Sequence, residues 1–75
     1  MTKIEDWHIR ELLVAMLFCG GTPSDSDMTR IYVHNDAIPG GVLPEALRRG
    51  YVSGEVGSRE VTEAGKAFVR EMSDD

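Results

Sequence analysis

The stretch of sequence that decides the fold is LRRGYVSGEVGSREVTEAGKAFV, residues 47–69. Gly50 can end a helix, and the β-favouring residues 51–53 that follow it predict a strand. Residues 54–57 begin and end with glycine and predict a turn, so residues 59–61 are expected to return as a second strand. The centre of this stretch is therefore predicted to be a two-stranded hairpin that directly follows a helix.

A helix is expected on each side of this hairpin. Before it, proline suits a first helical turn, so a short helix should begin at Leu43 or Pro44, end at Gly50 and point Leu47 inward. After it, Thr62 is well placed to cap a last helix. The inner face of that last helix should carry three apolar side chains: Ala64, Phe68 and Met72.

The N-terminal third contains the clearest helical pattern. Its apolar residues recur with the spacing of one helical face: Ile9, Leu12, Leu13, Met16 and Leu17. Thr2 and Glu5 offer a capping box at the start of this helix, and Gly20-Gly21 should end it. A second apolar stripe lies on nearly the opposite side: Trp7, Val14 and Phe18. This stripe is either covered by the rest of the domain or serves as a dimer or partner face.

A second helix is predicted from the residues that follow. Thr22 or Ser24 can cap it, and Pro23 suits its first turn. Its inward stripe is short: Met28, Ile31 and Tyr32. The helix should fade near His34, because turn-forming residues follow. The chain is thus expected to be one mostly helical α+β domain over residues 1–75, in the order α-α-α-β-β-α.

This order, together with the blocks LRRGYV (residues 47–52) and VTEAG (residues 61–65), resembles the winged helix-turn-helix family. Members of that family often carry a leucine, a basic pair, Gly-Tyr-Val, a wing and an LTEAG helix. The resemblance covers residues 43–70 and reaches the first two helices only by pattern. It implies a third helix in the DNA major groove and a wing on the phosphates. Four arginines are then the candidate contacts: Arg30, Arg48, Arg49 and Arg59.

Several residues depart from a DNA-reading pattern. Residues 42–46 offer almost none of the polar side chains that read base edges, and Glu55 places an acid near the wing tip. For Arg48 and Arg49 three interpretations stay open. They can pair with nearby acids at a helix end, contact phosphate, or contact an acidic protein partner.

Charge does not exclude either kind of partner. The 75 residues carry 8 basic and 13 acidic side chains, for a formal net charge of -5. Residues 28–70 nevertheless hold six bases and five acids, so the acidity lies mainly in the two terminal segments. Phosphate binding needs a local basic face, although distant negative charge slows the approach to DNA.

Metal, cofactor and catalytic chemistry have little support. Cys19, His8 and His34 are scattered without metal-ligand spacing, and Asp25 and Asp27 are better explained as helix-start acids. Cys19, at the end of an apolar helix, is expected to be a buried structural thiol. The longest apolar run is far short of the roughly 20 residues of a membrane span. We expect a cytoplasmic protein without a cofactor or enzymatic activity.

Two functions from different classes follow from these observations. The first is a small DNA-binding transcription regulator that contacts phosphates through the arginines of its third helix and wing, with the second apolar stripe as its dimer face. The second is an acidic winged-helix-like module that binds and inhibits a protein partner. A phage or mobile-element protein that acts on host nucleic-acid machinery is an example of the second class.

Overall fold

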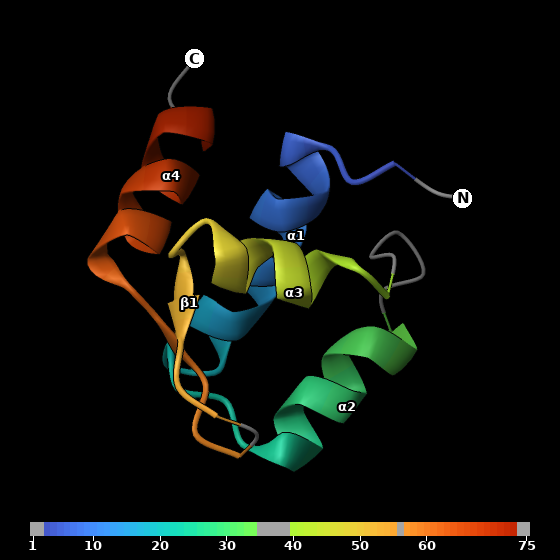
Figure 1. Cartoon of the computed structure of the whole chain (residues 1–75). Helices are drawn as coiled ribbons and strands as arrows, with labels where there is room; N and C mark the ends of the chain where they lie inside the picture. Colours follow the sequence, from blue (N-terminus) through green and yellow to red (C-terminus); the bar gives the residue numbers. More distant parts are fainter. Residues whose placement is uncertain (1–2, 35–39, 56, 74–75) are drawn as a thin grey trace.

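A computed structural model of the chain describes residues 3–34, 40–55 and 57–73 (Figure 1). Its elements, in chain order, are α1 (Asp6–Phe18), α2 (Asp25–His34), α3 (Val42–Arg48), β1 (Val52–Ser53), β2 (Glu60–Val61) and α4 (Glu63–Ser73). The predicted α-α-α-β-β-α order is confirmed over the described residues. The protein is a small, mostly helical α+β domain with one antiparallel pair of strands.

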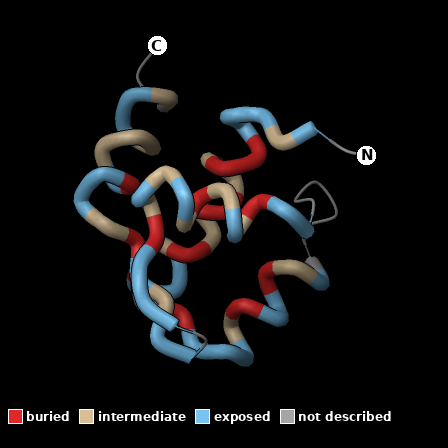
Figure 2. Tube along the Cα trace, in the orientation of Figure 1, coloured by how far each residue is buried: buried red, intermediate tan, exposed pale blue. Residues whose placement is uncertain are grey.

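Helix α1 lies at the centre of the domain and packs against α2, α3, α4 and β2. The buried apolar side chains come from every element except α4: Ile9, Leu12, Leu13, Met16, Met28, Ile31, Val42, Ala46, Val52 and Val61. In Figure 2 the buried segments gather along α1 and on the sides of α2, α3 and the hairpin that face it. Burial of each larger aliphatic side chain contributes about 1.5–3 kcal/mol, which makes α1 the main stabilising element.

The ends of α1 follow from local hydrogen bonds. At its start Glu5 is the N-cap, and its backbone N–H donates to Nδ1 of the buried His8 at 2.9 Å. The predicted capping box paired Thr2 with Glu5, and Thr2 lies outside the described residues. The cap differs from the prediction, because Glu5 is itself the N-cap and His8 is the residue that bonds back to it. At the other end the Gly20 and Gly21 amides donate to helix carbonyls at 2.9 and 3.0 Å, with φ of 87° and 85°. Such positive φ suits glycine, so the predicted Gly20-Gly21 end is confirmed.

The start of α2 is a reciprocal cap. The Asp27 amide donates to Ser24 Oγ at 3.2 Å, and the Ser24 amide donates to Asp27 Oδ2 at 3.2 Å. These bonds satisfy two amides at the helix start, so Ser24 is the capping residue. The placement of Pro23 in the first turn was wrong, because it precedes the helix and is fully buried. Its ring packs in the interior where the chain leaves α1 for α2.

Helix α3 begins slightly earlier than predicted, at Val42. Leu47 points inward as predicted, since it is half-buried and packs against the core. The prediction missed Val42 and Ala46, which are the fully buried residues of this helix. Gly50, with φ of 80°, closes the helix as expected, and its amide donates to the Leu47 carbonyl at 3.1 Å.

Each strand of the hairpin has two residues, one fewer than predicted. Val52 pairs with Val61 and Ser53 with Glu60. The Val61 amide also donates to the Gly21 carbonyl at 3.0 Å, so the connection between α1 and α2 lies beside β2. This bond ties the hairpin to the first half of the chain.

Helix α4 is capped by Thr62, as predicted, since the Gly65 amide donates to Thr62 Oγ1 at 3.1 Å. The Thr62 hydroxyl also donates to the Gly50 carbonyl at 2.6 Å. Ala64 is exposed, so its inward assignment was wrong, and Gly65 takes the buried position instead. A Cβ at Gly65 would lie 2.3 Å from the Tyr51 carbonyl oxygen, because α4 approaches the backbone leading into β1.

Candidate functional site

The outer face of α3 carries few groups that could read DNA. Of the seven described residues of this helix, Pro44 and Arg48 are exposed, while Val42 and Ala46 face the core. The remaining side chains are half-buried: Leu43, Glu45 and Leu47. Of the two exposed residues of this helix, Arg48 is the one whose side chain can donate a hydrogen bond. A groove-reading helix needs several such donors and acceptors.

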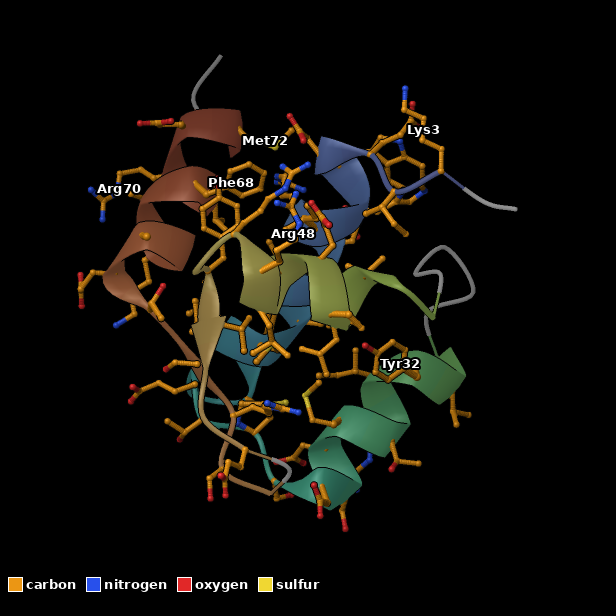
Figure 3. All side chains as sticks on the ribbon, viewed as in Figure 1. Lys3, Tyr32, Arg48, Phe68, Arg70 and Met72 are labelled. Atoms are coloured by element: carbon orange, nitrogen blue, oxygen red, sulfur yellow. The ribbon has the colours of Figure 1, made fainter. Side chains whose placement is uncertain are left out.

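Arg48 and Arg49 are brought together by Glu45, in an arrangement we call the Arg–Glu cluster (Asp6, Glu45, Arg48 and Arg49). Arg48 donates from Nε to Glu45 Oε1 at 3.0 Å and from Nη2 to Oε2 at 2.5 Å. Arg49 donates from Nε to the same Oε2 at 2.8 Å and from Nη1 to Asp6 Oδ1 at 2.9 Å. The cluster contains two guanidinium groups and two carboxylates, so its net charge is close to zero. Figure 3 shows Arg48 at the outer surface of α3.

The electrostatics of the cluster favour these internal pairs. Hydrogen bonds from Arg48 and then Arg49 lower the pKa of Glu45 to about 2, so this carboxylate stays ionised at neutral pH. The Glu45 hydrogen bond raises the pKa of Arg48, and the bonds to Glu45 and Asp6 raise that of Arg49. A phosphate would have to compete with Glu45 for both arginines.

Arg59 occupies a different surface. Its Nη1 donates to the Gly54 carbonyl within the hairpin. It borders a cleft of about 420 Å³ between α2, the start of α3 and the hairpin, lined by Asp25, Met28, Thr29, Tyr32, Leu43 and Arg59. Burial raises the pKa of Tyr32, against the opposing effects of a hydrogen bond from the Leu43 backbone and the positive charge of Arg59. In Figure 3 the Tyr32 ring lies between α2 and α3.

Arg30 does not join Arg59. The α2 residues that line the cleft follow i, i+3, i+4 spacing from Asp25, whereas Arg30 lies roughly 140° further round the helix. It is exposed to solvent. Of the four predicted arginines, the structure therefore brings together Arg48 and Arg49, and leaves Arg30 and Arg59 on separate surfaces.

The hairpin end of the molecule is acidic. A Cβ at Gly57 would lie 3.5 Å from Asp25 Oδ2, so the hairpin turn contacts the start of α2. This contact brings the first-turn acids Asp25 and Asp27 close to the hairpin that carries the exposed Glu55 and Glu60. Two acids therefore lie at the start of α2 beside the hairpin turn, and the hairpin itself carries two acids and Arg59. Acidic side chains thus outnumber basic ones where a DNA-binding wing would present basic residues.

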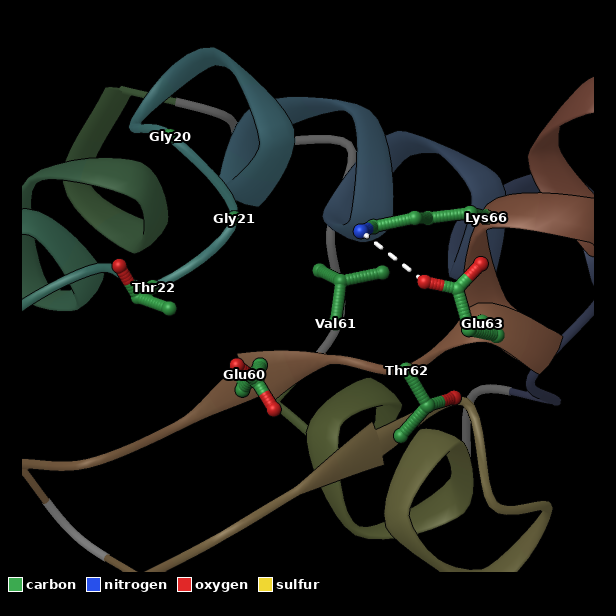
Figure 4. Close-up of a pocket in the computed structure, with 8 residues that line it drawn as sticks. All are labelled: Gly20, Gly21, Thr22, Glu60, Val61, Thr62, Glu63 and Lys66. Carbon is green, nitrogen blue, oxygen red and sulfur yellow. Dashed lines mark hydrogen bonds and ion pairs between the residues drawn. The ribbon is translucent and has the colours of Figure 1, made fainter.

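A pocket of about 290 Å³ lies between the α1–α2 connection, β2 and the start of α4 (Figure 4). Figure 4 shows Glu63 and Lys66 turned toward each other, with Lys66 Nζ 3.5 Å from Glu63 Oε1. Thr62, which also lines the pocket, donates to Gly50 and caps α4. Three of the polar side chains that line the pocket are therefore engaged with other groups of the chain: Thr62, Glu63 and Lys66.

The second apolar stripe divides into two parts. Val14 and Phe18 border an apolar cleft of about 310 Å³ with Leu17 and Val69, and Phe18 is 88% exposed. Trp7 lies apart and is 45% exposed. Its ring contacts that of its neighbour His8 in a tilted arrangement, with centroids 4.0 Å apart and an interplanar angle of 43°. Its Nε1 donates to Glu5 Oε2 at 2.8 Å.

Sequence reasoning missed Leu17 and Val69 as members of this surface. Leu17 follows the spacing of the buried face but lies at its edge, next to α4. Val69 flanks the predicted inner face of α4 by one position. In the sequence, each of these two apolar residues lies at the edge of the apolar stripe of its helix. The groove between two packed helices runs along such edges.

Cys19 is exposed, so the expected burial of this thiol was wrong. It follows the last residue of α1, where the chain turns toward Gly20 and away from the core. Among the described residues, no three histidine, cysteine, aspartate or glutamate side chains gather as a metal site would require.

Comparisons of the chain with family models, curated proteins and solved structures give no match. Within the ranges that the structure describes, no helix combines the length and the apolar character needed to cross a bilayer.

Proposed function

We propose that this protein is an interaction module built on a winged-helix-like scaffold, and that its partner is a protein with a basic surface. The scaffold assignment is supported by the α-α-α-β-β-α order and by the VTEAG helix start capped through Thr62. It is further supported by the Val61–Gly21 hydrogen bond, which holds the hairpin against the helical part of the domain. A fold does not determine a function, so the function is inferred from the charged groups on the surface.

The observation that carries the proposal is the internal engagement of the arginines nearest to a DNA-binding face. Glu45 accepts from both Arg48 and Arg49, and Asp6 accepts from Arg49 as well. Arg59 donates to the backbone of its own hairpin. Affinity for DNA comes largely from cations that replace condensed counterions on phosphates. Arginines already neutralised by carboxylates contribute little to that exchange.

The acidic hairpin end supplies the complementary feature. In a DNA-binding winged helix this end of the molecule would carry basic side chains that contact phosphate. Here it carries four carboxylates: Asp25, Asp27, Glu55 and Glu60. Carboxylates on a rigid scaffold complement a lysine- and arginine-rich groove and steer association with it. A partner that normally holds nucleic acid in such a groove would be inhibited by occupation of that groove.

Fluorescence anisotropy with a labelled lysine- and arginine-rich peptide tests this proposal. We expect binding that weakens as salt rises, and at least threefold weaker binding when Glu55 is changed to lysine. Changing Glu71 to lysine is the matched control, because this exposed acid lies on α4 away from the hairpin. If both variants lose the same affinity for the peptide, the effect comes from net charge alone. That result would contradict a binding site on the hairpin.

DNA binding is the second candidate, and one observation favours it. The Arg48 side chain is 71% exposed at the end of α3, although it is paired with Glu45. The test is binding to random-sequence duplex DNA over a salt series, with Arg48 and Arg49 changed to alanine in parallel. Tight binding whose salt slope becomes shallower in that variant would establish a regulator and replace the first proposal.

A further inference from the structure

We propose that a second copy of this chain docks on the surface formed by Val14, Leu17, Phe18 and Val69, here called the apolar face, to give a two-fold-symmetric dimer. The apolar face comes from the last turns of α1 and the middle of α4. It does not include the hairpin or the Arg–Glu cluster. Dimerisation therefore goes beyond the proposed function and can fail or succeed independently of it.

The shape of the apolar face is self-complementary. Phe18 protrudes with 88% of its surface exposed, and it stands at the edge of a cleft of about 310 Å³ lined only by apolar residues. When a protrusion and a hollow lie side by side on one face, a two-fold axis between them lets each copy fill the hollow of the other. The two Phe18 rings would then leave water together.

The charges at the borders of the apolar face match the same symmetry. On α1, Glu11 lies about two turns before Phe18 and roughly 20° further round the helix, on the side away from α4. Its side chain is 42% exposed while it pairs with Arg10. On α4, the exposed Lys66 and Arg70 lie beyond Val69 on the opposite border. A two-fold axis along the groove places the α1 border of one copy against the α4 border of the other. Glu11 would then face Arg70 of the second copy twice in each dimer.

Arg70 is well suited to such a contact. It forms no ion pair with any residue in the described part of the chain, and Figure 3 shows it pointing away from the body of the domain on α4. Glu11 and Lys66 by contrast already pair with neighbours on their own helices, at 3.2 Å from Arg10 and 3.5 Å from Glu63.

The exposed Cys19 provides a reporter for the interface. It directly follows Phe18, so each Cys19 thiol lies at the rim of the proposed interface. A short bismaleimide should therefore couple two chains of the wild-type protein through Cys19. The same reagent should leave chains uncoupled when the apolar face is disrupted.

The first experiment measures mass by sedimentation equilibrium from micromolar to millimolar protein. We expect the wild type to approach twice the 8.3 kDa of one chain, and Phe18→Glu to remain a monomer with at least a tenfold larger dissociation constant. Val33→Glu is the matched control, because Val33 is also a 65% exposed apolar residue but lies on α2. A wild type that stays monomeric at millimolar concentration, or equal effects of the two variants, would overturn the dimer. Circular dichroism checks that both variants fold.

The second experiment tests the symmetry with charge reversals. Glu11→Arg and Arg70→Glu should each weaken self-association at least tenfold, because each places like charges at both contacts of its homodimer. Mixing the two variants in equal amounts should restore dimers, since opposite charges then meet at both contacts. Variants that dimerise as well as the wild type, or a mixture that stays monomeric, would contradict the proposed arrangement.

Discussion

Replacing Gly65 by alanine should strongly destabilise the domain, although alanine is the better helix former. A Cβ at this position would lie 2.3 Å from the Tyr51 carbonyl oxygen and 2.9 Å from Val61 Cγ1. Real Cβ atoms do not approach this closely, and the nearer neighbour is backbone, which cannot rotate aside. Helix α4 would have to move away from β1.

The size of the effect can be worked from these contacts. Overpacking against well-packed neighbours costs typically about 1–3 kcal/mol, and a clash with backbone belongs at the upper end of that range. Moving α4 also loosens the Phe68 ring from Tyr51, now stacked at 4.5 Å, and such pairs contribute about 0.5–1.5 kcal/mol. The gain in helix propensity returns only about 1 kcal/mol. We expect a net loss of about 2–3 kcal/mol in the free energy of unfolding.

Thermal and urea unfolding followed by circular dichroism measure this loss. For a domain of this size it corresponds to a fall in Tm of about 10–20 °C. Ala64→Gly is the matched control, because Ala64 is exposed on the same helix and the change should cost only about 0.5–1 kcal/mol through propensity. A Gly65→Ala protein as stable as the wild type would refute the close approach of α4 to β1.

Three further predictions concern the surface of the domain. Changing Glu45 to glutamine removes the negative charge shared by Arg48 and Arg49 and one of the two oxygens that accept from them, so affinity for duplex DNA should rise. The slope of log K against log salt should steepen by about 0.9 for one added phosphate contact at Arg48, since Arg49 stays paired with Asp6. Unchanged binding in filter or anisotropy assays would show that Glu45 does not mask these arginines. The lowered pKa of Glu45, about 2, means that its ion pairs stabilise the native state above the ordinary glutamate pKa and lose that effect as pH falls from about 4.5 toward 2. The stability difference between wild type and Glu45→Gln should accordingly narrow over this range in urea melts, and a difference that is constant with pH would contradict the pairing. Because Cys19 is exposed, a thiol reagent should modify it in the native protein nearly as fast as in urea, and strong native protection at concentrations where the protein is monomeric would argue against its exposure.

Much of the fold was predictable because the residues that start and end its helices act through local interactions. Gly50 and Gly20-Gly21 end helices through positive φ, and Thr62 caps α4 through its own hydroxyl. These effects depend on neighbours within a few residues, so they can be read from a linear pattern. The main errors concern which residue of a helix faces the core, because the buried residue lies one position away from the predicted one. Gly65 and not Ala64 faces inward, since the close approach of two backbones leaves no room for a methyl group.

The candidate site was less predictable because its partners are distant in the chain. Pairing of the two arginines with a nearby acid was one of the open interpretations, and Glu45 lies on the same helix at i, i+3 and i, i+4. The Arg49–Asp6 pair joins residues 43 positions apart and needs the packing of α3 against α1. Likewise, the separation of Arg30 from Arg59 depends on how α2 is rotated against the hairpin.

The sequence by itself determined the order of elements, the helix ends and the face of α1 that forms the core, because caps, turns and apolar periodicity are local or nearly so. Only the tertiary structure decided which charges neutralise one another and which apolar groups remain outside. Arg48 and Arg49 meet Glu45 and Asp6, whereas Phe18 is left exposed beside the groove between α1 and α4. Both outcomes depend on how whole helices pack, since packing fixes the distances that electrostatic and hydrophobic interactions require.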